Sequence, residues 1–424
     1  MASRSFVRVL SAALSLLLIL VCSVAAQTPP KVIKIGAVYP LTGNIASTGL
    51  DNKTGVDLAV DIINGKYDLD LPLARTMGLP NLGGAKIEIV YADTKGDARN
   101  GMSETERLVT SEHVVAMIGA YQSAVTKTAS QETERLKIPF VCSDASSPTL
   151  TERGFKYFYR VSPHDDIMAK DPFAFLKDLE KKTGQKVQTV ALLYENTEFG
   201  SQAGKAYERY AKEFGYKVVA NISYPNSATD VSSEVSKLIV AKPDVLLHAS
   251  YITDAILFTK TFKEKGFQPK GIITMAGYIE PAYLPAVKAD GNYIFIRSTF
   301  ATDLAKSKPL VAKVNALYKQ KYGHDMSENA ARSFMAPFVI ADAINRAKST
   351  DPDAILKALN ETNIPGNQLI YPWQGIKFDP KTHQNIYAKG TLVQVLGQNY
   401  VTVWPFEAAS KPFVWPFPAW QGRK

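Results

Sequence analysis

Short apolar runs and amphipathic segments alternate along the first third of this chain. Runs rich in β-branched residues, typical of buried strands, occupy 31–40, 86–93, 114–120 and 138–143. Segments with apolar residues at helical spacing lie between them, at 51–64, 100–112 and 126–137. Such alternation predicts βαβ units and a parallel sheet with helices on both faces.

The alternation then begins again after residue 164. Predicted helices lie at 165–184, 200–215, 231–241 and 253–266, and predicted strands at 189–195, 217–224, 244–250 and 271–277. Two βα series in one chain predict an α/β protein with two doubly wound lobes.

In the last third of the chain, strands and helices no longer alternate. Three consecutive helices are predicted at 309–323, 327–349 and 352–362, followed by a β-rich tail that holds three of the four tryptophans. The insert 65–84 has too many Pro and Gly residues for regular structure, so we expect a surface loop there.

The amino terminus indicates the compartment. Arg4 and Arg8 precede a short apolar core and then small residues, a pattern that predicts a signal peptide over 1–26 and export to the periplasm. A lipid anchor on Cys22 is the alternative, although Val21 stands where that signal prefers a small residue. The formal charge of +9 is spread along the chain, so it gives no indication of nucleic-acid binding.

The mature chain would keep one cysteine, Cys142, so it can form no internal disulfide and no cysteine-rich zinc site. The five histidines show no pair at metal-ligand spacing, and we expect neither a metal nor another cofactor. Cys142 ends an apolar strand, where a lone cysteine is usually a small core residue.

Hydroxyl groups gather where predicted strands end. Ligands of open parallel sheets bind beyond the carboxyl ends of the strands, and two such loops here are "AYQSAVT" (120–126) and "DASSPT" (144–149). Serines beside helix starts can hold a carboxylate, so both loops could share one anionic group. The alternative is that these serines only cap helices.

Aromatic residues follow the same strand ends and could form the wall of a cleft between the lobes, or pack in the core. They are Tyr39, Tyr121, Tyr194, Phe199, Tyr251 and Tyr278. Catalysis has less support, because no G-x-S-x-G elbow surrounds Ser123 or Ser146 and no base is spaced near them. A secreted α/β hydrolase remains a distant alternative.

Three segments together resemble the leucine/isoleucine/valine-binding protein family. They are "IKIGAVYPLTGNIASTG", "AMIGAYQSAVTKTASQETERLKIPFVCSDASSPTLTERGFKYFYRVSP" and "LLYENTEFG". The resemblance implies a type I periplasmic binding protein whose two lobes are joined by a three-segment hinge. It implies crossovers near 159–163, 294–300 and 365–375.

The resemblance also implies ligand-binding positions. The ligand carboxylate would lie against Ser123, Ala145 and Ser146, and the aromatic and loop positions fall on Phe199, Tyr251 and Thr48, beside Tyr121. The acidic residue that receives a ligand ammonium in the family falls near Gly277, with Glu280 three residues further on. An ammonium buried without a carboxylate would cost several kcal/mol, so amino-group recognition is the point where this chain departs.

We therefore expect a monomeric, non-enzymatic solute-binding protein that serves an inner-membrane ABC permease. The expected organisation is 1–26 signal peptide, 27–160 lobe 1, 161–297 lobe 2, 298–368 return to lobe 1, and 369–424 crossover and tail on lobe 2. A branched-chain or related amino acid is the expected solute, and an aromatic or other ammonium-free carboxylic acid or an amide is the alternative.

Overall fold

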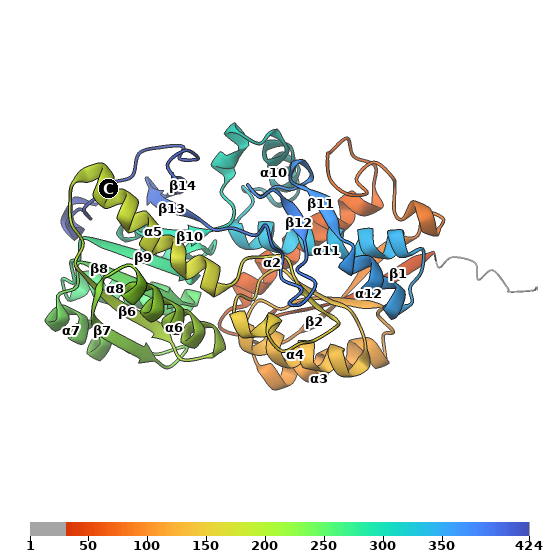
Figure 1. The fold of residues 1–424 in the computed structure, drawn as a ribbon, viewed down its shortest axis with the longest axis horizontal. Coiled ribbons are helices and arrows are strands. Elements are labelled where there is room, and N and C mark those ends of the chain that lie inside the picture. The colour runs from red at the N-terminus through yellow and green to blue at the C-terminus, as the bar shows by residue number, and fades with distance from the viewer. Residues whose placement is uncertain (1–30, 424) are drawn as a thin grey trace, which may run out of the picture.

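The structure, a computed structural model, describes residues 31–423 and places them in two α/β lobes side by side (Figure 1). The predicted signal peptide, 1–26, lies outside the described residues. Within 31–423, no helix is long and apolar enough to cross a membrane.

Lobe 1 is built on a five-stranded sheet with the order β2-β1-β3-β4-β5, and each adjacent pair is parallel. The strands are β1 (Val32–Tyr39), β2 (Lys86–Asp93), β3 (Ala116–Gly119), β4 (Phe140–Cys142) and β5 (Phe158–Arg160). Strands β3, β4 and β5 are buried along their whole length, and this burial explains why β3 and β4 lie in the continuous apolar runs 114–120 and 138–143.

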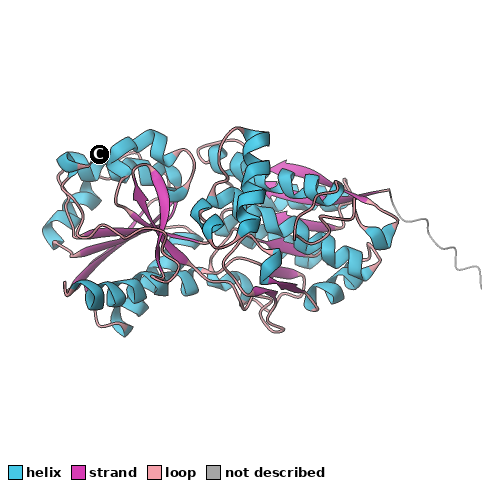
Figure 2. Ribbon diagram, turned by 90° about the horizontal axis from the view of Figure 1, so that it is seen from above, coloured by secondary structure: helices cyan, strands magenta, loops and turns pink. Residues whose placement is uncertain are grey.

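Helices cover both faces of this sheet (Figures 1 and 2). The pair α3 (Ala98–Thr110) and α4 (Ser123–Leu136) lies on one face, and α2 (Ala46–Asn64) packs with α11 (Glu328–Ala347) on the other. Helices α10 (Pro309–Tyr322) and α12 (Pro352–Asn360) join lobe 1 from the last third of the chain. The three predicted C-terminal helices are therefore confirmed.

Lobe 2 has a seven-stranded sheet with the order β14-β13-β10-β9-β8-β6-β7. The strands are β6 (Thr189–Glu195), β7 (Lys217–Tyr224), β8 (Val245–Ser250), β9 (Gly271–Ala276), β10 (Phe295–Ser298), β13 (Thr391–Leu396) and β14 (Asn399–Trp404). Strands β6 to β10 pair in parallel, whereas the tail adds β13 and β14 antiparallel at one edge.

Helices of lobe 2 also lie on both sides of their sheet (Figure 2). They are α5 (Asp165–Thr183), α6 (Glu198–Glu213), α7 (Ser232–Ala241), α8 (Ile252–Glu264) and α9 (Tyr283–Val287). The α5–α6 pair and the contacts of α8 with α7 and α9 form the two helical layers. The predicted two-lobe α/β architecture is thus confirmed.

The chain passes between the lobes three times. The first passage, 161–164, links β5 to α5, and the second, 299–308, links β10 to α10. The third lies later than the expected 365–375, because β11 (Asn363–Pro365) pairs there with β12 (Gly375–Lys377) in a small antiparallel sheet. The chain rejoins the lobe 2 sheet at Thr391, within the segment 369–424 that was expected to hold the crossover and the tail.

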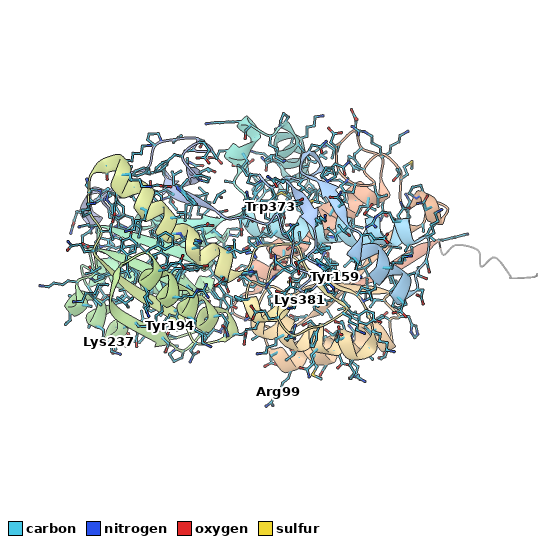
Figure 3. The ribbon with its side chains drawn as sticks, viewed as in Figure 1. Arg99, Tyr159, Tyr194, Lys237, Trp373 and Lys381 are labelled. Carbon is cyan, nitrogen blue, oxygen red and sulfur yellow. The ribbon has the colours of Figure 1, made fainter. Side chains whose placement is uncertain are left out.

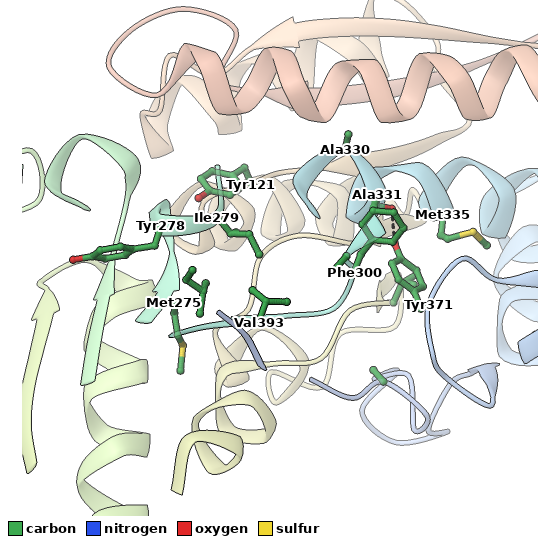
Figure 4. Packing of buried hydrophobic residues seen from close by; sticks show 14 of the residues in the cluster. Tyr121, Met275, Tyr278, Ile279, Phe300, Ala330, Ala331, Met335, Tyr371 and Val393 are labelled. Carbon is green, nitrogen blue, oxygen red and sulfur yellow. Dashed lines mark hydrogen bonds between the residues drawn. The ribbon is translucent and has the colours of Figure 1, made fainter. Parts of the chain in front are cut away.

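The return segment, residues 366–390, leads from lobe 1 back to lobe 2. It packs beside lobe 1 in the middle of the molecule, where Figure 3 labels Trp373 and Lys381. Trp373 stacks on Tyr371 with ring centroids 4.1 Å apart and donates to the Lys389 carbonyl at 2.8 Å. Tyr371 in turn donates to the Ala331 carbonyl at 2.5 Å, beside Phe300 of the second passage (Figure 4). These contacts tie the return segment to α11.

The insert 65–84 differs from a simple surface loop. It contains one short 3-10 turn, Pro80–Leu82, but Leu69, Leu71, Ala74 and Leu79 are buried in the main hydrophobic core. The insert therefore covers part of lobe 1 instead of standing free in solvent.

Candidate functional site

The two lobes place their ligand-binding edges at equivalent points. In lobe 1 the strand order reverses between β1 and β3, and in lobe 2 it reverses between β6 and β8. Open α/β sheets bind ligands at such switch points, beyond the carboxyl ends of the strands. The loops after β3 and β4 in lobe 1 and after β6 and β8 in lobe 2 meet at one cavity.

This cavity comprises about 230 Å³ of space between the side chains, its open mouth included, and is lined from both lobes. Its lining comprises Tyr121, Ser123, Asp144 and Ser146 from the lobe 1 loops, Arg332 from α11, and Phe199, Tyr251, Ala276 and Arg297 from lobe 2. Charged, hydroxyl-bearing and aromatic side chains therefore meet at one site between the lobes.

Three of the predicted aromatic residues form one wall. Tyr251 packs against Tyr121 across the lobe boundary with ring centroids 5.6 Å apart, and against Phe199 at 5.3 Å. The Tyr251 hydroxyl is buried and has no hydrogen-bond partner among the described residues. Burial raises the pKa of this hydroxyl, and the nearby Thr197 side chain opposes the shift.

The other three predicted aromatics have structural roles. Tyr39 donates to Asp144 at 3.4 Å, Tyr194 packs on Gly204 of α6, and Tyr278 bonds His248 at 2.7 Å inside lobe 2. Figure 4 shows the ring of Tyr278 extending away from Tyr121. Figure 3 labels Tyr194 in lobe 2.

The two serine loops come together as expected from the strand order. Ser123 is the first residue of α4, and its Oγ accepts a 3.1 Å hydrogen bond from the Ser147 N–H of the second loop. Gln122, not Ser123, occupies the N-cap of α4, and no side chain caps that helix. The Ser123 hydroxyl is therefore not used as a cap, and its proton remains free to donate into the cavity.

Ser146 lines the cavity beside Ser123, while Ala145 is buried next to it and does not line the cavity. Arg160 of β5 holds this loop by donating to the Ser147 carbonyl at 2.6 Å and the Ala145 carbonyl at 3.4 Å. Arg160 Nε also donates to Gln384 at 2.7 Å, which connects the loop to the third passage.

Thr48 and Gly277 do not line the cavity. A side chain at Gly277 would meet the Tyr251 backbone at 2.3 Å, so this glycine lets the β9 and β8 loops approach each other. Glu280 reaches across the boundary instead, and its carboxylate accepts hydrogen bonds from the Thr48 and Tyr121 hydroxyls. The ligand-binding roles assigned to the predicted positions stay predictions, but five of them, Tyr121, Ser123, Ser146, Phe199 and Tyr251, share one cavity.

Two arginines of the cavity were not predicted, because neither the hydrophobic periodicity nor the ends of the predicted strands point to them. Arg297 lies in β10 directly after the apolar run 294–296, and Arg332 lies on α11 among small and apolar residues. Both guanidinium groups are at most 3% exposed. A charged residue inside an apolar strand or helix face is rarely buried without a partner, and that rule could have selected both.

Burial dominates the acid–base behaviour of the site. It raises the pKa of Asp144 and of Asp165 to about 6, and that of Glu280 to about 7. Burial also raises the pKa of the Cys142 thiol to about 11, which keeps this cysteine protonated and unreactive near neutral pH.

The histidines offer no base to the serines. No histidine of the described chain lines the cavity. His164 accepts from the Ile167 N–H at the start of α5, and burial lowers the pKa of His164 and of His248 to about 3. Within residues 31–423, no group of three His, Cys, Asp or Glu side chains could hold a metal ion.

Fold and cavity together define a two-lobed binding protein that encloses a small ligand between its lobes. The family model described as "Periplasmic binding protein" matches residues 32–399. A Leu/Ile/Val-binding protein homolog 7 from Brucella suis biovar 1 is 30% identical over 387 residues, which are 89% of this chain and 92% of the relative. The chain belongs to this periplasmic binding protein family, a family of solute-binding proteins and not of enzymes.

Solved structures share the fold. The branched-chain amino acid transporter substrate-binding protein LivJ from Streptococcus pneumoniae, in complex with isoleucine, has a TM-score of 0.72 at 22% identity and covers 87% of this chain and 98% of its own. A solute-binding protein of an ABC transporter from Rhodopseudomonas palustris BisB5, in complex with 3,4-dihydroxybenzoic acid, has a TM-score of 0.70 at 19% identity, covering 87% and 95%. The predicted type I periplasmic binding fold is therefore confirmed.

Proposed function

We propose that this protein is the periplasmic solute-binding component of an ABC importer and captures a small carboxylate-bearing solute between its lobes. The observation that carries the proposal is the cavity itself, where Ser123 and Ser146 of lobe 1 face Phe199 and Tyr251 of lobe 2. Hydroxyl donors on one side and aromatic rings on the other suit a carboxylate joined to an apolar body.

Capture works by closure of the lobes. A ligand in the cavity contacts both lobes only when they are together, so it shifts the population towards the closed form. The inner-membrane permease then recognises that closed form, and the three passages between the lobes act as the hinge. The expected functional unit is a single copy of the chain.

The solute has two main candidate classes. The names of the relatives favour a branched-chain or related amino acid, and LivJ was solved with isoleucine. The aromatic wall favours an ammonium-free carboxylic acid with an aromatic body, the class of the ligand in the Rhodopseudomonas structure. An amide is the third class.

Calorimetry on the mature protein tests the proposal. Leucine, isoleucine and valine are titrated against benzoate and 3,4-dihydroxybenzoate, and we expect one of these solutes to bind with 1:1 stoichiometry. The variants Ser123→Ala and Ser146→Ala should each weaken that binding by about 1–3 kcal/mol, the range for a hydrogen bond to a charged group. Unchanged affinity in both variants would contradict the proposal that Ser123 and Ser146 bind the carboxylate of the ligand.

The same experiment separates binding from catalysis. A binding protein releases its ligand unchanged, so chromatography of the solute after long incubation should recover it without a product. Conversion of any stabilising solute would overturn the proposal in favour of a hydrolase.

A further inference from the structure

Two buried arginines from different lobes line the same cavity. Arg297 belongs to β10 of the lobe 2 sheet, and Arg332 belongs to α11, which packs against α2, β3 and β4 of lobe 1. Their exposed fractions are 1% and 3%. Closure of the lobes therefore brings two positive charges together in a site with little water.

The protein itself satisfies these two groups only in part. Glu328 lies 3.9 Å from Arg297 Nη1 and 3.9 Å from Arg332 Nε, so one carboxylate serves both guanidinium groups at the outer limit of an ion pair. Within the described residues, Nε of Arg297 and Nε of Arg332 have no hydrogen-bond partner. Arg332 Nη2 does donate to the Asp144 carbonyl. Buried guanidinium donors without partners are costly, so these atoms are available to an anion.

The two charges also repel each other. Burial, followed by the positive charge of Arg332, lowers the pKa of Arg297, so the neighbouring charge disfavours its charged form. The pKa of Arg332 is raised instead, because its burial is outweighed by the charges of Glu328 and Asp144. Glu328 sits on the same helix as Arg332, one turn away, and so accompanies Arg332 whether the lobes are open or closed. An anion that lies between the arginines offsets the repulsion that closure creates.

Among the described residues, the lining of the cavity includes one acid, Asp144, against two arginines. Asp144 lines it, but its carboxylate accepts from Asn52 at 3.1 Å, Ser143 at 3.1 Å and Ser333 at 3.2 Å. Glu280 is occupied by Thr48 and Tyr121 and does not line the cavity. The cavity therefore presents the guanidinium groups of Arg297 and Arg332 to a ligand, whereas protein side chains already donate hydrogen bonds to the Asp144 carboxylate.

Asp165 and Glu328 are buried acids near the cavity that could compete for an ammonium, and Glu328 Oε2 has no hydrogen-bond partner among the described residues. Asp165 is fully buried, and neither of its carboxylate oxygens has a hydrogen bond of ordinary length among the described residues. It does not line the cavity, but the Ser146 side chain lies close enough to oppose the rise in pKa that burial causes. After burial, the charge of Arg297 is the largest influence on the pKa of Asp165 and lowers it. Asp165 therefore acts as a partial counter-ion of Arg297 and needs its own test.

We propose that Arg297 and Arg332 clamp an anionic group of the solute from the two lobes, and that the preferred solute is a small organic acid with net negative charge. This inference rests on the proposed function and narrows it. A monocarboxylate without an ammonium and a dicarboxylate share this chemistry. A zwitterionic amino acid has no net negative charge, because its ammonium offsets the charge of the carboxylate that the two arginines would bind.

Matched ligands test the preference. Thermal shift and calorimetry compare leucine with 4-methylpentanoate, which differs only in lacking the ammonium, and phenylglycine with phenylacetate by the same logic. Glutarate and succinate form the dicarboxylate arm. We expect the acid of each pair to bind at least about 10-fold more tightly than its amino acid, or a dicarboxylate to bind most tightly of all.

The outcomes separate the two proposals. Tighter binding of leucine than of 4-methylpentanoate overturns the anion clamp and leaves the solute-binding function in place. A panel in which no solute binds contradicts the proposed function, and the clamp with it.

Substitutions test the residues. Arg297→Gln and Arg332→Gln should each weaken the preferred acid by about 30-fold or more, and Arg297→Lys should lose less because it keeps the charge without the planar fork. The control Arg209→Gln removes the same charge from an exposed position on α6 of lobe 2 and should bind normally. Circular dichroism and the melting temperature establish that each variant is folded.

Asp165→Asn completes the test. Loss of a negative charge beside Arg297 should tighten binding of the acid by several-fold. If Asp165→Asn instead abolishes binding of leucine, Asp165 is an ammonium seat and the proposed preference is wrong. Equal affinity of wild type and Arg297→Gln for the acid would likewise overturn the clamp.

Discussion

The hydroxyl of Tyr121 in lobe 1 donates a 2.6 Å hydrogen bond to Glu280 Oε1 in lobe 2. Thr48 donates to the other carboxylate oxygen of Glu280, so this single side chain from lobe 2 is held by two hydroxyls of lobe 1. Glu280 is 1% exposed, and its bonds exist only while the lobes are together. It is therefore a contact of the closed form beside the ligand cavity.

Glu280 should make the closed form sensitive to pH. Burial raises the pKa of Glu280 from its ordinary value of 4.5 to about 7, although the hydrogen bonds from Thr48 and Tyr121 oppose the shift. Between these two values the folded protein binds a proton that the unfolded chain has released. The resulting stabilisation is complete below about pH 4.5 and is lost as the pH rises through about 7.

Melting curves between pH 4.5 and 8 check this prediction. Other buried acids, Asp144 and Asp165 among them, shift in the same direction, so wild type should lose stability across this range. Glu280→Gln removes one titrating group and should show a smaller fall between pH 5 and pH 8. Identical pH profiles for wild type and Glu280→Gln would show that Glu280 does not titrate in this interval.

A second contact between the lobes should control ligand release. Glu198, at the start of α6 in lobe 2, accepts from Ser147 at 2.9 Å, Thr149 at 2.7 Å and Lys127 at 3.0 Å, all in lobe 1. Glu198→Ala should weaken ligand binding by about 1–2 kcal/mol, mainly through faster dissociation, because the lost contacts stabilise the closed form.

Stopped-flow dissociation of the bound solute measures this effect. The control is Glu208→Ala, an exposed acid further along the same helix. A change confined to the association rate, or an equal effect in the control, would mean that Glu198 does not hold the lobes together.

The sequence predicted the lobes well because parallel strands buried on both faces leave a strong local pattern. The apolar run over β8 and the helical spacing over α5 are examples that need no knowledge of distant residues. The resemblance implied a third passage at 365–375, where the structure instead pairs β11 with β12, and hydrophobic periodicity does not predict that pairing.

The site was predictable only where its residues follow strand ends. Ser123 and Tyr251 were found in this way, since strand order carries their loops to the switch points. Arg297 and Arg332 were missed, because each is a lone charge in an apolar segment. Their meeting in one cavity follows from the packing of α11 and from the second passage between the lobes.

Gly277 should tolerate no side chain. A Cβ at this position would meet Tyr251 C at 2.3 Å and Ile252 N at 2.5 Å, both backbone atoms that cannot move aside singly. Gly277→Ala should lower the free energy of unfolding by about 1–3 kcal/mol or more and displace Tyr251 from the cavity wall. Gly277→Asp should do the same and should not create affinity for leucine.

Chemical denaturation and calorimetry check both variants. Gly422→Ala serves as the control, because a Cβ at Gly422 meets open space and its backbone is not left-handed. Leucine binding gained by Gly277→Asp in a stable protein would show that position 277 faces the ligand after all.

Arg160 should couple the hinge to the ligand site. Its guanidinium is fully buried and donates to the Ser147 carbonyl of the loop 144–149, which lines the cavity. It also donates to Thr151 at 2.9 Å and to Gln384 of the third passage. Burial lowers the pKa of Arg160 to about 10, so the group remains charged at neutral pH. Arg160→Met leaves these acceptors without donors and should cost about 3 kcal/mol or more of folding stability.

The conservative variant separates coupling from stability. Arg160→Lys keeps the charge, but one ammonium cannot donate to both the loop 144–149 and Gln384 as the planar guanidinium does. We therefore expect a folded protein from which the solute dissociates several-fold faster. Stopped-flow dissociation and denaturation of Arg160→Lys measure the two effects separately. A protein that is destabilised yet releases its solute at the wild-type rate would show that Arg160 supports the fold alone.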